Sequence, residues 1–131
     1  MARIQSNRSI NREKFQVSRL EAQLSDPAHR RYRVFENLSR MLRVRRKTPA
    51  FDPAAGFRVE SSPQTLFILR RGNASTGFLV AVHNVTAQIQ PLPESLLNEG
   101  PWVDRLDGGI LEAAGPSLLK PYEVRWLARA S

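Results

Sequence analysis

The chain has 131 residues, of which 41% are hydrophobic and 24% are charged, a composition typical of globular proteins and not of general disorder. Its length excludes a complete (β/α)₈ barrel, which needs about 200 residues or more, and the absence of cysteine excludes a disulfide scaffold and a thiolate zinc site. The formal net charge of +8 is concentrated in residues 1–50, which carry 13 Lys/Arg against 4 Asp/Glu, whereas residues 51–131 carry 7 against 8.

The N-terminal part is therefore basic, and a basic surface attracts phosphates, nucleic acid or an acidic protein face. No apolar run approaches the length of about 18 residues that crosses a bilayer. The first 15 residues contain no apolar signal segment. We therefore expect no membrane partner and a cytoplasmic location.

Two helices are predicted in the N-terminal part, after a polar loop or arm over residues 1–14. Ser18 and Glu21 have the spacing of a capping box, and a stripe of Val17, Leu20 and Leu24 predicts a short helix there. Residues 28–47 contain no Gly or Pro, and their apolar side chains recur at helical spacing, which predicts an amphipathic helix of about five turns. The predicted stripe of this second helix consists of Val34, Phe35, Leu38, Met41, Leu42 and Arg45.

Beyond Pro53 and Gly56 the hydrophobic period changes to two, which is typical of strands. Two strands joined by the Gly/Asn-rich segment 72–77 predict a hairpin. Further strands are predicted over residues 87–92, 102–106, 110–112 and 121–127. Turns every 8–12 residues favour an antiparallel sandwich or part-barrel. The predicted fold class is thus α+β, with an arm and one or two helices followed by an antiparallel β-sandwich.

Catalytic chemistry has little support in the sequence. His29 and His83 lie in different predicted elements without an acidic partner. A structural role is expected for His83, and a solvent-facing position on the helix is expected for His29. Asp104, Asp107 and Glu112 are candidates for the carboxylate pair of a glycosidase, but Asp107 followed by two glycines is better explained as a turn. Two histidines without cysteine make a zinc site unfavourable, and we predict no metal and no cofactor.

A candidate binding segment lies at the N-terminus, where Arg8, Asn11 and Arg12 bring two guanidinium groups and an amide close together. Guanidinium groups bind phosphate or carboxylate in a bidentate manner. Composition alone leaves two interpretations open, a ligand-binding loop for phosphate or sugar and a disordered basic arm.

Three segments together resemble the sucrose phosphorylases and their glucosylglycerate phosphorylase relatives in glycoside hydrolase family 13. Arg8-Ser9-Ile10-Asn11-Arg12 is similar to an Arg-Asp/Ser-Ile-Asn-Arg motif of that family. Leu42-Arg43-Val44-Arg45-Arg46-Lys47-Thr48-Pro49-Ala50-Phe51 is similar to the end of the last barrel helix. His83-Asn84-Val85 and Pro121-Tyr122-Glu123-Val124-Arg125-Trp126-Leu127 resemble the C-terminal β-domain.

The resemblance implies an enzyme that moves a glucosyl unit between an acceptor and phosphate with retention, through a carboxylate nucleophile and a second carboxyl group as acid/base. In the family those residues lie on earlier barrel strands that this chain does not contain. Residues 1–50 would then be a remnant of the barrel and residues 51–131 an all-β C-terminal domain. The expected partner is the parent enzyme's catalytic barrel or a split-gene partner chain, and the chain alone should be inactive. By the same resemblance, Arg8 matches an arginine near the acceptor and phosphate position.

Two alternatives come from other function classes. A stand-alone β-sandwich could bind carbohydrate by stacking Trp102, Trp126 and Tyr122 on sugar rings, although such residues are more often core or edge residues. The arginines of residues 28–47 could bind nucleic acid. No recognisable nucleic-acid-binding motif accompanies them, which makes this alternative the weaker one.

Overall fold

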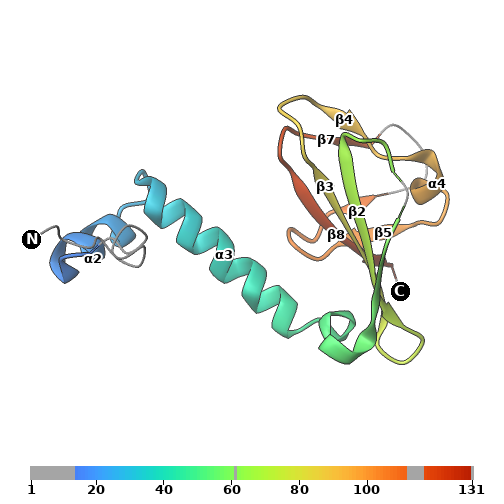
Figure 1. Cartoon of the computed structure of the whole chain (residues 1–131), viewed down its shortest axis with the longest axis horizontal. Helices are drawn as coiled ribbons and strands as arrows, with labels where there is room; N and C mark the ends of the chain where they lie inside the picture. Colours follow the sequence, from blue (N-terminus) through green and yellow to red (C-terminus); the bar gives the residue numbers. More distant parts are fainter. Residues whose placement is uncertain (1–13, 61, 112–116, 131) are drawn as a thin grey trace, which may run out of the picture. The chain divides into compact units, whose positions relative to one another are not determined.

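The computed structural model describes residues 14–60, 62–111 and 117–130, and it divides into two compact units. The first unit ends at Ser39 and the second begins at Arg40, within helix α3 (Arg30–Arg46) (Figure 1). None of the helices in the described part of the chain is long and apolar enough to cross a membrane.

Both predicted helices are present, since α2 spans Val17–Ser25 and precedes α3. The predicted capping box is wrong: Gln16 is the N-cap of α2 and makes no side-chain cap hydrogen bond, so Ser18 already lies inside the first turn. Between the helices, the Asp26 carboxylate accepts a hydrogen bond from the Ala28 N–H at 2.9 Å. The imidazole Nδ1 of His29 accepts the Arg31 N–H at 3.1 Å, so His29 caps α3 and does not lie along it.

The second unit is built on an antiparallel sheet of six strands in the order β1-β2-β3-β8-β5-β6, with a separate antiparallel pair β4-β7. The α+β class with a sandwich-like β part is therefore confirmed. In chain order, the remaining elements are η1 (Pro49–Phe51), η2 (Pro53–Ala55), β1 (Phe57–Val59), β2 (Leu66–Asn73), β3 (Gly77–Asn84), β4 (Gln90–Pro91), α4 (Glu94–Leu97), β5 (Trp102–Asp104), β6 (Ile110–Leu111), β7 (Leu118–Leu119) and β8 (Val124–Arg129).

The predicted hairpin is confirmed by the pairing of β2 with β3, which runs from Leu66↔Asn84 to Asn73↔Gly77. The side-chain oxygen of Asn73 accepts the N–H groups of Ser75 and Thr76 and so closes the turn. Gly72 has a φ of +97°, and a Cβ there would lie 1.9 Å from the carbonyl oxygen of Gly77. Only glycine fits this position.

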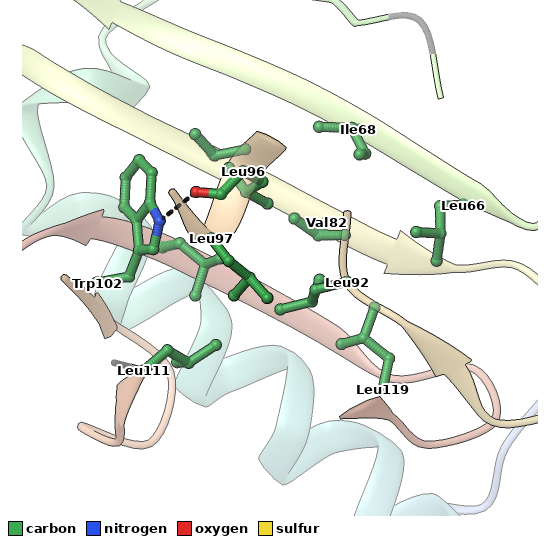
Figure 2. Packing of buried hydrophobic residues seen from close by; sticks show 11 residues of the cluster. Leu66, Ile68, Val82, Leu92, Leu96, Leu97, Trp102, Leu111 and Leu119 are labelled. Carbon is green, nitrogen blue, oxygen red and sulfur yellow. Dashed lines mark hydrogen bonds between the residues drawn. The ribbon is translucent and has the colours of Figure 1, made fainter. Parts of the chain in front are cut away.

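One face of the six-stranded sheet packs against α4, β7 and the chain before α4. Trp102 lies at one end of this cluster, where its indole N–H donates to the Leu96 carbonyl at 2.8 Å (Figure 2). The same view shows Leu66, Ile68 and Val82 of the sheet facing Leu92 and Leu119. The cluster is made of Leu66, Ile68, Val80, Val82, Leu92, Leu96, Leu97, Trp102, Leu111, Leu119 and Leu127.

The opposite face of the sheet carries a second, smaller cluster around Trp126. The Phe51 ring of η1 packs on the Trp126 ring with a centroid distance of 4.6 Å. Met41 and Val44 of α3 pack against this cluster, which explains why the second unit begins inside the helix.

Candidate functional site

The predicted binding residues Arg8, Asn11 and Arg12 lie outside the described residues, and their role stays a prediction. Glu112, one of the candidate carboxylates, also lies outside them. Over residues 14–60, 62–111 and 117–130, no three His, Cys, Asp or Glu side chains gather in a way that could hold a metal ion.

The other titratable candidates occupy structural positions. Asp104 is buried, and one of its carboxylate oxygens accepts the N–H groups of Leu106 at 2.9 Å and Trp126 at 3.1 Å. Burial raises the pKa of Asp104, and these two hydrogen bonds lower it in part. Asp107 accepts the N–H of Gly109 at 2.8 Å, as expected of a turn residue.

His83 lies half-buried in β3, where its ring meets the edge of Phe67 at a centroid distance of 5.7 Å. Burial lowers the pKa of His83, so the imidazole is neutral at neutral pH. The structural role that we expected for this histidine fits its position in the sheet.

The two tryptophans named in the carbohydrate-binding alternative are core residues, with 1% of Trp102 and 7% of Trp126 exposed. Their rings cannot stack on a sugar without opening the core. Tyr122 is exposed, but it lies before β8 at a backbone φ of +56° and is not part of an aromatic surface with them. Sugar binding through these three residues therefore has no support.

The feature that most resembles a functional surface is an apolar face on the helices. We define the apolar stripe as Val34, Phe35, Leu38 and Leu42 of α3, whose exposed fractions are 49, 53, 56 and 63%. Within the first unit, Leu20 and Leu24 of α2 line a groove of about 530 Å³ together with Val34, Phe35 and Leu38 of the stripe. Large apolar side chains exposed together on one face mark a surface that is normally covered by a partner.

The last turns of α3, from Arg40 on, belong to the second unit. Met41 and Val44 pack on the Trp126 cluster, and the Arg40 guanidinium donates to the Leu106 carbonyl at 2.7 Å. Leu42, between these residues in sequence, is exposed. In these last turns, Met41 and Val44 are partly buried against the strands, whereas Leu42 is exposed. We call the part of the second unit that follows residue 48 the β-unit.

Charged side chains are concentrated around Arg70 on β2. Its guanidinium donates to Glu60 at 2.6 Å through Nε and to both carboxylate oxygens of Glu99, at 2.9 and 3.0 Å. Glu60 also accepts a hydrogen bond from Arg58 at 3.2 Å. The hydrogen bond from Arg70 is the main reason why the pKa of Glu60 lies below its usual value.

This geometry predicts a pH dependence of stability. Because the pKa of Glu60 is lower in the folded state than in the unfolded chain, its stabilising contribution is present above the unfolded value and is lost as the pH falls through the folded value. Glu60→Gln should cost about 1.5–3 kcal/mol at pH 7, the usual contribution of a hydrogen bond to a charged group. Urea unfolding at pH 7 and pH 3 measures both effects. The prediction is contradicted if the difference between wild type and variant does not shrink at pH 3.

The sequence of the chain was compared with those of known proteins. No protein-family model matches it. The glucosylglycerate phosphorylase of Allomeiothermus silvanus is 31% identical over 121 residues, or 92% of this chain, and that of Escherichia coli is 29% identical over the same length. The enzyme of the same name from Spirochaeta thermophila is 37% identical over 98 residues, or 72% of the chain.

The chain is related to the glucosylglycerate phosphorylases. It spans about a fifth of their length, with coverage of 20, 21 and 17% of the three relatives. The resemblance that the three motifs predict is confirmed, and the partial coverage agrees with a C-terminal part of such a phosphorylase.

Proposed function

We propose that the chain serves as the C-terminal part of an α-glucoside phosphorylase of glycoside hydrolase family 13 and is inactive without a catalytic barrel. The enzyme so completed would cleave glucosylglycerate or sucrose with phosphate to give glucose 1-phosphate. The observation that carries the proposal is the apolar stripe, whose large side chains are exposed along α3. In this proposal a (β/α)₈ barrel covers the stripe.

The carboxylates of the described residues support the proposed lack of activity. A retaining mechanism needs two carboxyl groups about 5–5.5 Å apart, one as nucleophile and one as acid. Glu60 and Glu99 bind the same guanidinium, and the lowered pKa of Glu60 makes it a poor acid at neutral pH. Asp104 is held by backbone N–H groups in the core. In this proposal the catalytic pair comes from the barrel.

The N-terminal arm is the part that we assign to the active site of the completed enzyme. By its resemblance to the family motif, Arg8 would bind phosphate or the acceptor, with Asn11 and Arg12 beside it. Guanidinium groups recognise phosphate through paired N–H donors. Ser9 stands where some members have Asp, and the choice of acceptor depends on this loop.

Complementation tests the proposal. The Escherichia coli glucosylglycerate phosphorylase is shortened by the segment that this chain matches, and the chain is added to it with glucosylglycerate and phosphate. We expect glucose 1-phosphate from the mixture and from neither part alone. Leu38→Glu with Leu42→Glu should lower the rate at least tenfold, because the charges oppose burial of the stripe. Ile89→Glu with Tyr122→Glu, at exposed positions of the β-unit, is the matched control.

Two results would overturn the proposal. Release of glucose 1-phosphate by the purified chain alone would show that it carries its own catalytic pair. Equal loss of complementation in the stripe variant and in the control variant would show that the stripe is not the docking surface.

A further inference from the structure

A pocket of about 550 Å³ lies on the β-unit, on the sheet face that also carries the Trp102 cluster. The strand register places its residues side by side: Arg58 of β1 pairs with Arg70 of β2, and Trp102 of β5 pairs with Arg129 of β8. Directly paired residues of antiparallel strands point to the same face. We call this site the arginine pocket, because its lining includes Arg58, Arg70 and Arg129 together with Phe78, Glu99 and Trp102.

Gly56 and Gly72 are two of the residues that line the pocket, and neither has a side chain. Gly72 pairs with Phe78 of β3, and its N–H donates to the carbonyl of Gly56 at 3.4 Å. Phe78 in turn lies one step beyond the pair Leu79↔Ala128, and so opposite Arg129. The half-exposed Phe78 of β3 thus lies between Gly72 of β2 and Arg129 of β8.

The arginines of the pocket differ in how many of their N–H donors already form hydrogen bonds. Arg70 uses three of its N–H groups on Glu60 and Glu99. Arg129 lies over the Trp102 ring at 5.1 Å, and among the described residues its side chain donates one long hydrogen bond, to the Gly100 carbonyl at 3.4 Å. Within the described part of the chain, Arg129 forms no ion pair. The Arg129 guanidinium is thus held over an aromatic ring, and most of its N–H groups can still donate to a ligand.

We propose that the arginine pocket binds a small polyol or sugar that carries an oxyanion, either phosphate or carboxylate. Arg129 holds the oxyanion, the Phe78 ring packs on the apolar face of the ligand, and Glu99 accepts from its hydroxyl groups. The pocket is lined by three arginines and one glutamate, and Glu60 binds two of these arginines from outside the lining. The net charge is therefore +1 with Glu60 included, which favours an anion over a neutral sugar. The volume is within the range of small-molecule sites, about 300–1,000 Å³.

This proposal does not depend on the proposed docking function. The pocket is formed by η2, β1, β2, β3, β5 and β8 with the turn after α4, and none of the apolar stripe lines it. An isolated chain that fails to dock on any barrel would still bind the anion.

The test is a titration of the full ¹⁵N-labelled chain with glucose 1-phosphate, glycerate, inorganic phosphate and glucose in separate experiments. We expect glucose 1-phosphate or glycerate to saturate shifts of the Trp102 indole and of the Phe78 and Arg129 amides, at least tenfold more tightly than phosphate or glucose. The tighter of the two anionic polyols identifies the oxyanion. Saturation by neither, or equally tight binding of glucose, would overturn the proposal.

Variants decide whether the pocket residues do the binding. Arg129→Gln should weaken binding at least tenfold. Because this variant also loses the contact between Arg129 and the Trp102 ring, Phe78→Ala is a second, independent variant, and it should weaken binding by the same factor. Arg105→Gln removes an exposed arginine outside the pocket and should leave the dissociation constant unchanged. Unchanged binding in a folded Phe78→Ala variant would overturn the assignment.

Discussion

Replacing Trp102 by alanine should destabilise the β-unit by about 3–5 kcal/mol, the usual cost of deleting a buried aromatic side chain. The side chain is 1% exposed and is the largest of the fully buried ones in the described chain. Its removal leaves a cavity beside Leu96 and Leu111 and deprives the Leu96 carbonyl of the indole N–H. Because whole domains are stable by only about 5–15 kcal/mol, this loss should lower the denaturation midpoint sharply.

Two further variants separate the components of the Trp102 effect. Trp102→Phe keeps most of the ring and removes the hydrogen bond, so we expect a cost of about 1–3 kcal/mol. Val85→Ala, at an exposed position, should change stability by about 0.5 kcal/mol or less. Urea unfolding followed by circular dichroism measures all three. A midpoint for Trp102→Ala equal to that of wild type would contradict the packing described above.

The elements predicted correctly were those with a strong local signal. The segment 28–47 has no Gly or Pro and keeps a helical period, and α3 is found there with its start two residues later and its end one residue earlier. The β2–β3 hairpin has alternating strands and a turn that Asn73 closes with its own side chain. In both cases the residues that specify the structure are near one another in sequence.

The missed or shortened elements depend on distant contacts. The strand predicted over residues 87–92 is reduced to β4, because the chain after β3 curls around the Asn84 side chain. That amide donates to the Gln88 and Lys120 carbonyls and accepts the Thr86 N–H. β1 has all three residues exposed and forms only by pairing with β2. Neither feature has a signal in its own local sequence.

Of the candidate sites, the stripe also has a local signal in the sequence, whereas the arginine pocket depends on distant contacts. The periodicity of the helix identified Val34, Leu38 and Leu42 as one stripe, and these residues are exposed. It also grouped Met41 with them, whereas Met41 packs on the Trp126 cluster, because a single period cannot tell which of two partners each residue meets. The arginine pocket has no sequence signature at all. Arg58, Phe78 and Arg129 are 20 or more residues apart, and only the strand order brings them together.

The exposed stripe should make the free chain self-associate. Each of its side chains gains about 1 kcal/mol when its remaining exposed area is buried, at about 25 cal/mol per Å². Replacing Val34, Leu38 and Leu42 by serine should then weaken self-association by about 3 kcal/mol, or about 100-fold in the dissociation constant. Sedimentation velocity over a range of concentrations measures the change.

The control for this prediction removes the same amount of apolar surface elsewhere. Val85→Ser, Ile89→Ser and Tyr122→Ser lie on the β-unit with exposed fractions of 52, 61 and 67%, and this triple variant should associate like wild type. If the wild-type chain stays monomeric at all concentrations, exposure of the stripe does not cause self-association and the prediction is wrong. An equal effect of both triple variants would mean that general hydrophobicity drives association. A loss of self-association in the helix variant alone is expected only if the stripe is the contact surface. Such a result supports the interpretation that the exposed stripe of α3 binds a partner.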